Sequence, residues 1–154
     1  MKLSDLIPFE NIVTNAAGKS KKRILEDLSL FLSGRINGVD SEKLYQGLLA
    51  RERLGSTGIG EGTAIPHCRM PGCEKITAAF FKLNSPVDFD STDNILVDLV
   101  FALVVPEEEH NAHLDALSSI AELLQDKKTC EILRNSSSKE VFYQAIKNGG
   151  AKKK

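Results

Sequence analysis

The sequence predicts one α/β or α+β domain in which helices pack on a mixed β-sheet. The chain has 154 residues, of which 42% are hydrophobic and 27% are charged, as expected for a single domain with a real core. Two segments, Ile76–Leu83 and Val97–Val105, are rich in apolar residues on both faces, which is typical of inner strands covered on both sides. Helical patterns stand before and after these strands, and this order of elements indicates the fold class.

The first third of the chain is predicted to hold two long helices after a short start. Leu3–Pro8 indicates a loose helical turn, and Ile12-Val13 indicates a short strand. Ser20 can cap a helix that runs to about Ser33, and Asp40 can cap a second helix through about Arg53.

The rest of the chain returns from the strands to helices. Asn84–Asp90 is predicted to be a loop, and Pro106 is expected to end the second inner strand. Glu107–Gln125 predicts a helix with a core stripe at Leu114, Leu117, Ala121 and Leu124. Lys127–Arg134 predicts a short helix, and Ser137 with Glu140 predicts a capping box for a last helix through Ile146. Residues 1–148 are expected to form the domain, and 149–154 a flexible basic tail.

A glycine-rich segment lies between the second helix and the first inner strand. Gly55–Gly62 holds four glycines in eight residues, and Ala64-Ile65 then predicts a brief buried strand that Pro66 ends. Glycine lets backbone amides approach a ligand closely. The spacing does not match a Walker loop or the dinucleotide-binding fingerprint.

His67 follows Pro66 at the predicted end of this strand. An imidazole nitrogen is a good nucleophile near neutral pH, because its free base is well populated there. The sequence therefore indicates a reactive histidine. The alternative is a glycine-rich turn before a core strand, with His67 a structural histidine whose hydrogen bonds are satisfied.

Two further residues are candidates for holding an anion beside His67. Arg51 comes just before the glycine-rich segment, and a guanidinium offers donors in a plane that suits phosphate; a solvated helix-end cation is the alternative. His113 lies in the first turns of the helix after Pro106, where helix amides favour an anion; a histidine at the edge of the core is the alternative.

The residues Glu52–Gly60, followed by Gly62-Thr63-Ala64-Ile65-Pro66-His67, resemble the signature of enzyme IIA domains of the bacterial phosphotransferase system. The match is to the fructose/mannitol type, and within it most to the nitrogen-related branch. It covers roughly Leu3 to Ile146, with one departure at Cys68, where glycine is commonest in the family.

This resemblance implies a mixed sheet of about five strands flanked by helices. It implies that His67 carries a phosphoryl group on the ring nitrogen remote from Cβ. Arg51 matches the family arginine near that histidine, and His113-Leu114 with Leu117 matches its second histidine. The amides of the glycine-rich segment, at Thr57, Gly58 and Gly60, are expected to bind the phosphoryl oxygens as well.

The implied function is that of a phosphotransferase with a phosphohistidine intermediate. The protein would accept phosphate from a histidine-containing phosphocarrier and act as a regulator on target proteins. One alternative is a sugar-transport enzyme IIA that passes phosphate to a permease component. Another is a binding module with the same fold and no chemistry. Ile59, Met70 and Pro71 are candidate contacts for the carrier, or local packing residues.

Composition excludes several other classes of function. The net charge of −1 gives no electrostatic case for nucleic acid, and no apolar run reaches the ~20 residues that span a bilayer. The start of the chain lacks a signal-peptide core, so a cytoplasmic protein is expected. Cys68, Cys73 and Cys130 form no Cys-x-x-Cys pair, and neither a disulfide framework, a metal nor a cofactor is predicted.

Overall fold

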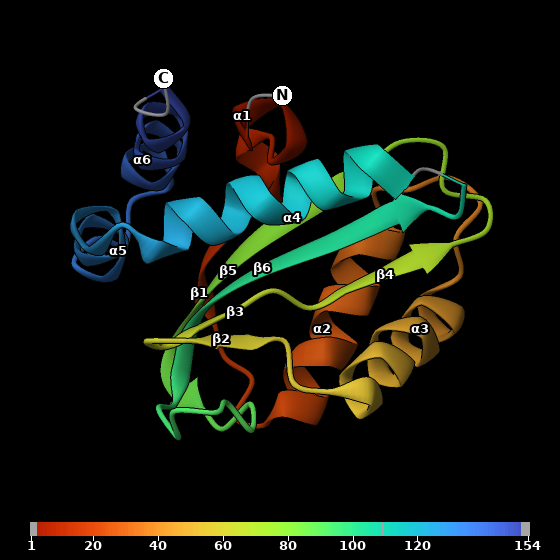
Figure 1. The fold of residues 1–154 in the computed structure, drawn as a ribbon, viewed down its shortest axis with the longest axis horizontal. Coiled ribbons are helices and arrows are strands. Elements are labelled where there is room, and N and C mark those ends of the chain that lie inside the picture. The colour runs from red at the N-terminus through yellow and green to blue at the C-terminus, as the bar shows by residue number, and fades with distance from the viewer. Residues whose placement is uncertain (1–2, 109, 152–154) are drawn as a thin grey trace.

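The protein is a three-layer α/β structure in which a mixed sheet lies between two layers of helices (Figure 1). The computed structural model describes residues 3–108 and 110–151. Its elements in chain order are α1 Leu3–Leu6, the 3₁₀ turn Phe9–Asn11, β1 Ile12–Ala16, α2 Lys21–Ser33, α3 Ser41–Leu54, β2 Gly58–Gly60, β3 Thr63–Ala64, β4 His67–Met70, β5 Thr77–Val87, β6 Val97–Pro106, α4 His110–Gln125, α5 Lys127–Arg134 and α6 Lys139–Ala151.

The sheet has the order β1-β5-β6-β3-β2, and β4 pairs with β6 beyond the end of β3. β5 and β6 are antiparallel, while β1 is parallel to β5, and β3 and β4 are parallel to β6. Because β3 and β4 follow one another along the same side of β6, the sheet has five strand positions. The predicted mixed sheet of about five strands is confirmed.

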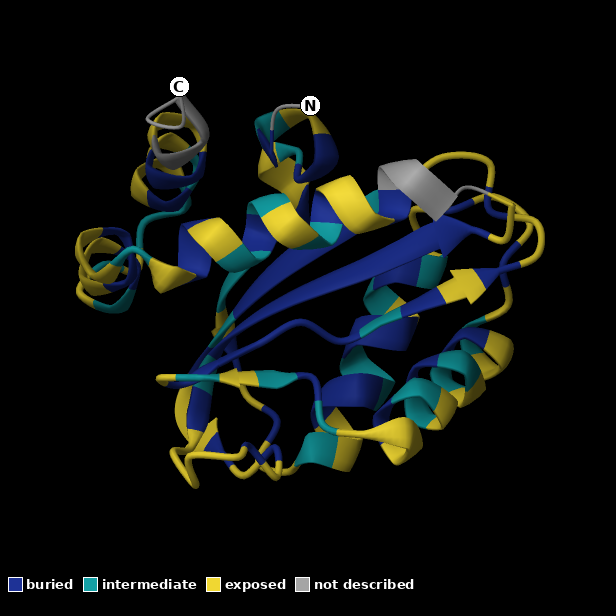
Figure 2. Ribbon diagram, in the orientation of Figure 1, coloured by how far each residue is buried: buried dark blue, intermediate teal, exposed yellow. Residues whose placement is uncertain are grey.

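Strand β6 separates two hydrophobic cores. Val100, Ala102 and Val104 belong to the core under α2 and α3, whereas the alternate residues Phe101 and Leu103 belong to the core under α1, α4, α5 and α6. Alternation of side chains along a strand produces this division. Figure 2 shows β6 buried along its length, as the continuous apolar run predicts.

The predicted helix starts are confirmed at the two long N-terminal helices. Ser20 Oγ accepts from the amide of Arg23, and the Asp40 carboxylate accepts from the amide of Lys43, each at 3.1 Å. The last helix starts one residue later than predicted, because Ser138 rather than Ser137 accepts from the Val141 amide. This helix runs to Ala151, and residues 152–154 lie outside the described part, so the basic tail stays a prediction.

Two further predictions are wrong. Asn84–Val87 is not a loop, because β5 continues through it and Val87 pairs with Val97 after an irregularity in the register. Leu114 is not part of the core stripe and is 60% exposed, since the buried face of α4 runs through His113, Ala116 and Ile120 instead. Residues 113 and 114 are neighbours in sequence and therefore point about 100° apart around the helix.

Candidate active site

His67 is held by the sheet at the first residue of β4. The preceding Pro66 has no amide to donate, but its carbonyl accepts from the amide of Leu103 at 2.9 Å, and His67 then pairs with Leu103. The brief strand does end before Pro66, as predicted, because β3 stops at Ala64, but the sequence did not predict that pairing with β6 resumes at His67. The chain leaves the strand for two residues, Ile65 and Pro66, and then pairs with β6 again, so pairing with β6 holds the backbone of His67 in place.

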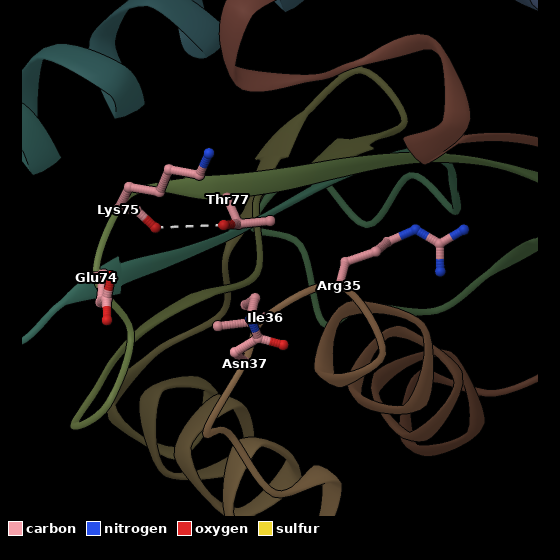
Figure 3. A pocket seen from close by; sticks show the side chains of 6 residues that line it. All are labelled: Arg35, Ile36, Asn37, Glu74, Lys75 and Thr77. Carbon is pink, nitrogen blue, oxygen red and sulfur yellow. Dashed lines mark hydrogen bonds between the residues drawn. The ribbon is translucent and has the colours of Figure 1, made fainter.

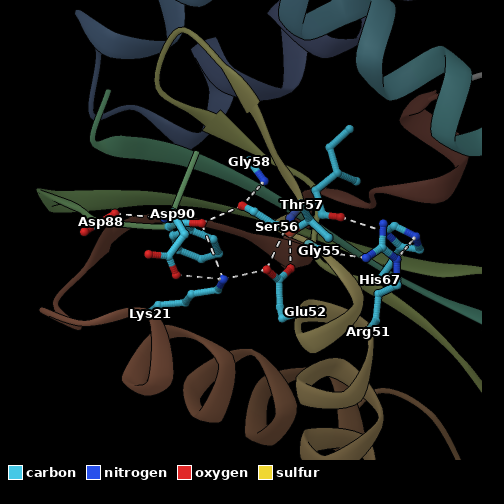
Figure 4. Close-up of polar contacts among 12 residues, drawn as sticks. Lys21, Arg51, Glu52, Gly55, Ser56, Thr57, Gly58, His67, Asp88 and Asp90 are labelled. Atoms are coloured by element: carbon cyan, nitrogen blue, oxygen red, sulfur yellow. Dashed lines mark hydrogen bonds and ion pairs between the residues drawn. The ribbon is translucent and has the colours of Figure 1, made fainter. Parts of the chain in front are cut away.

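The two ring nitrogens of His67 have different partners (Figure 4). Nδ1 lies 2.8 Å from the carbonyl oxygen of Ile65, and Nε2 lies 3.3 Å from Nε of Arg51. A carbonyl oxygen can only accept and a guanidinium can only donate. Both contacts therefore select one tautomer, in which Nδ1 carries the proton and Nε2 presents a lone pair. Nε2 is the nitrogen remote from Cβ that the resemblance implies.

Burial lowers the pKa of His67 below its ordinary value of 6.5. The Ile65 carbonyl opposes this shift by stabilising the protonated ring, the positive charge of Arg51 lowers the pKa further, and the negative charge of Glu52 raises it. Because the net direction is downward, the imidazole is neutral at pH 7. The ring is then in its nucleophilic form at neutral pH.

Arg51 reaches His67 from the last turn of α3, which packs against β4. Besides the contact to His67, its Nη1 donates to the carbonyl of Gly55 at 2.9 Å. A guanidinium has five N–H groups, and these two contacts use two of them. The side chain is thus oriented and still has donors that can face an anion on Nε2.

His113 approaches His67 from the opposite layer. It lies near the start of α4, it is 8% exposed, and the centroids of the two imidazole rings are 5.5 Å apart. The structure therefore brings together Arg51, His67 and His113 from α3, β4 and α4, as the sequence predicts.

The donors of Thr57 and Gly58 have other partners in this structure. The amide and hydroxyl of Thr57 both donate to the Glu52 carboxylate, and the Gly58 amide donates to Ser56 Oγ at 3.0 Å. Figure 4 shows Gly58 over Ser56 and away from His67. These contacts do not support the predicted phosphate binding by Thr57 and Gly58.

Close packing and backbone conformation explain instead why glycine stands at positions 58 and 60. A Cβ on Gly58 would overlap Ser91 Oγ, so β2 approaches Ser91 closely. Gly60 has a φ of +101°, which glycine adopts readily where β2 turns towards β3. The carboxylate of Asp93 lies beside Gly60 and accepts from the amide of Glu61 at 2.8 Å.

Cys68 points to the other face of the sheet from His67. It lies in the core under α2 and α3, against Gly47, and burial raises the pKa of its thiol to about 12. A thiol with this pKa is protonated at neutral pH, so it is no partner in the chemistry of His67.

Sequence reasoning missed Glu52, which is buried and ion-paired with Lys21 at 2.8 Å. A signal was present, because Glu52 continues the four-residue spacing of Leu44 and Leu48 on the buried stripe of α3. A carboxylate in such a stripe indicates a specific polar partner.

A pocket of about 500 Å³ lies between the α2–α3 and β4–β5 connections (Figure 3) and is lined by Arg35, Ile36, Asn37, Glu74, Lys75 and Thr77. Its arginine is already bound, because Arg35 donates to Asn11 Oδ1 at 2.9 Å and to the Phe31 carbonyl at 3.2 Å. Within residues 3–108 and 110–151, no cluster of His, Cys, Asp or Glu could hold a metal ion, and no helix is long and apolar enough to span a membrane.

Comparison with known proteins gives a consistent result over nearly the whole chain. Residues 5–149 match the family model for the phosphoenolpyruvate-dependent sugar phosphotransferase system, EIIA 2. A nitrogen regulatory protein of Pseudomonas aeruginosa is 38% identical over 146 residues, which cover 95% of this chain and 95% of that protein. The fructose-specific EIIABC component of Bacillus subtilis is 31% identical over 95% of this chain, which spans 23% of that larger protein.

Solved structures agree. The nitrogen regulatory protein IIA-Ntr of Neisseria meningitidis superimposes with a TM-score of 0.89 at 37% identity, covering 94% of this chain and 98% of that one. The mannitol IIA structure of Escherichia coli has a TM-score of 0.75 at 23% identity, covers 89% of this chain and 96% of that one, and shows the fold alone.

Proposed function

The chain belongs to the EIIA 2 family of the phosphoenolpyruvate-dependent sugar phosphotransferase system, and on this premise we propose that His67 carries the phosphoryl group. The phosphoryl group comes from a histidine-containing phosphocarrier. The single observation that carries the proposal is the state of the His67 ring, whose Nδ1–H is bound to Ile65 and whose Nε2 presents a lone pair beside Arg51.

The transfer is an in-line displacement at phosphorus. The Nε2 lone pair forms the new N–P bond as the N–P bond to the carrier's histidine breaks, and that electron pair returns to the carrier's ring. The Nδ1 proton stays on His67, so the Ile65 carbonyl stabilises the positive charge that develops on the imidazole. Phosphoryl transfer needs mainly positioning and charge stabilisation, which these groups supply.

Arg51 must change partner during this step. Its 3.3 Å contact with Nε2 is at the long end for a hydrogen bond and is lost when Nε2 bonds to phosphorus. Its N–H groups then donate to the phosphoryl oxygens, with charge-assisted bonds that are stronger than the one lost. His113 lies on the opposite side and donates to another oxygen.

The phosphorylation state serves regulation. Support comes from the relatives named nitrogen regulatory proteins, which match this chain over 95% of its length at 38% identity. The sugar-transport route is tested separately, by offering the phosphorylated protein to a fructose-type permease component. Rapid and complete loss of phosphate to that component would favour transport.

The carrier is proposed to dock on exposed apolar side chains of α3, β2 and α4. Ile59 is exposed, and so are Leu54 at the end of α3 and Leu114 beside His113. Pro71 is exposed too. Met70 is buried in the core under α2 and α3, so we do not propose it as a contact for the carrier. Chemical-shift mapping with the carrier should perturb Leu54, Ile59 and Leu114.

The test of the function is direct. The protein is incubated with phosphoenolpyruvate, enzyme I and the phosphocarrier, and its intact mass is measured at neutral pH and after acid treatment. One acid-labile phosphate is expected, with none on His67→Ala. The absence of labelling in the wild type, or full labelling of His67→Ala, would contradict the proposal.

A further inference from the structure

We propose that Glu52 is a positioning residue for phosphoryl transfer, which holds the Ile65 carbonyl against His67 Nδ1 by way of Thr57. The inference rests on the proposed phosphorylation of His67. The Glu52 carboxylate does not itself touch the reacting atoms.

The Glu52 side chain is 3% exposed, and the partners of its carboxylate come from two sides. On one side it forms an ion pair with Lys21 Nζ at 2.8 Å, and Lys21 lies at the start of α2. On the other side it accepts from both donors of Thr57, the amide at 3.2 Å and the hydroxyl. A buried carboxylate is costly unless it is paired, so these contacts fix Thr57 against α3.

Thr57 then connects to His67 through one residue. The amide of Ile65 donates to the carbonyl of Thr57 at 3.0 Å, and the carbonyl of Ile65 accepts from His67 Nδ1 at 2.8 Å. The position of Thr57 therefore sets the position of Ile65 and of the acceptor that selects the His67 tautomer. Figure 4 shows Glu52 between Lys21 and the pair of Arg51 and His67.

Two adjacent residues of α3 thus act on the two ring nitrogens of His67. Arg51 contacts Nε2 directly, and Glu52 reaches Nδ1 through Thr57 and Ile65. Their charges also oppose each other, because Arg51 lowers and Glu52 raises the pKa of His67. The same helical turn holds the segment at Gly55, through Arg51 Nη1.

A purely structural role makes a different prediction. If Glu52 only joined α3 to α2, its loss would lower stability and leave the ring of His67 unchanged. Removal of one partner of a buried ion pair lowers stability in either case, because it leaves Lys21 without the Glu52 carboxylate. The state of the His67 ring therefore separates the two roles.

The decisive variant is Glu52→Gln, which keeps the size of the side chain and removes its charge. ¹⁵N NMR of the unphosphorylated protein reports the tautomer and the pKa of His67, and the rate of phosphoryl acceptance is measured with the carrier. We expect a folded protein with a mixed His67 tautomer, a lowered pKa of His67, and acceptance slower by about 10- to 100-fold, as for a small misplacement in a reacting pair. The pKa falls because the negative charge and part of the Ile65 contact are both lost.

Glu42→Gln is the matched control, since it makes the same change on an exposed residue in the first turn of the same helix. It should behave as the wild type. Thr57→Val removes only the hydroxyl contact and should shift the tautomer in the same direction by less, so it decides the matter if Glu52→Gln does not fold. A wild-type tautomer and rate in the folded variants would overturn the proposal. If the wild type accepts no phosphate, the proposed function fails while the NMR comparison still tests the positioning of His67.

Discussion

Replacement of Arg51 by alanine should affect both the acidity and the reactivity of His67. The change removes the Nε contact to His67 Nε2, the Nη1 contact to Gly55, and one positive charge beside the ring. A phosphoryl group brings almost two negative charges to this position. A hydrogen bond to a charged group contributes about 1.5–3 kcal/mol, so the loss of one such bond in the transition state slows transfer by about 10- to 150-fold.

The same variant should raise the pKa of His67. The charge of Arg51 is one of the causes that hold this pKa below 6.5, so its removal shifts the pKa upward. The slower transfer therefore occurs in a protein whose His67 is a stronger base, which separates loss of charge stabilisation from loss of nucleophile basicity.

The assay combines rapid-quench measurement of phosphoryl acceptance with NMR titration of the imidazole resonances. Arg53→Ala is the control, because Arg53 lies in the same helical turn and is exposed. It should leave both quantities unchanged. A rate for Arg51→Ala within about twofold of the wild type, or an unchanged pKa of His67, would refute the reasoning.

Other predictions concern pH, packing and the second histidine. Because the folded pKa of His67 is lowered, the unfolded chain binds more protons than the folded protein between that pKa and 6.5. The free energy of unfolding, measured by chemical denaturation, should therefore rise with pH through this window. His67→Gln should flatten this rise. Gly58→Ala should lower the free energy of unfolding by about 1–3 kcal/mol, since the new Cβ overlaps Ser91 Oγ. Gly34→Ala is the control, because the nearest atom to its new Cβ lies at 3.5 Å, and thermal unfolding should show that it is tolerated. His113→Ala should still accept phosphate but pass it on more slowly in a single-turnover assay, and a complete loss of acceptance would show that His113 has a larger part.

Local signals in the sequence determined the helix starts and indicated the candidate reactive residue. Ser20 and Asp40 cap their helices because each side chain bonds an amide only three residues away, so neighbours in sequence are sufficient. The run Val97–Val105 is apolar on both faces, which requires cover on both sides and hence a central strand. The glycine-rich segment followed by Pro66 and His67 indicated the candidate nucleophile. Arg51 and His113 were candidates from the residues alone, and the family resemblance favoured them over their structural alternatives.

Only the tertiary structure decided which polar groups meet across elements. The donors of Thr57 were available to a phosphate on sequence grounds, but α3 places Glu52 within reach of both. His113 is buried and Leu114 is exposed, although Leu114 was expected in the core stripe. The rotation of α4 about its axis depends on its packing against the sheet, and the helical period alone leaves that rotation undetermined. The tautomer of His67 is likewise set by its contacts to Ile65 and Arg51. Arg51 is sixteen residues away in sequence and on another element, so its contact with His67 depends on how α3 packs against β4.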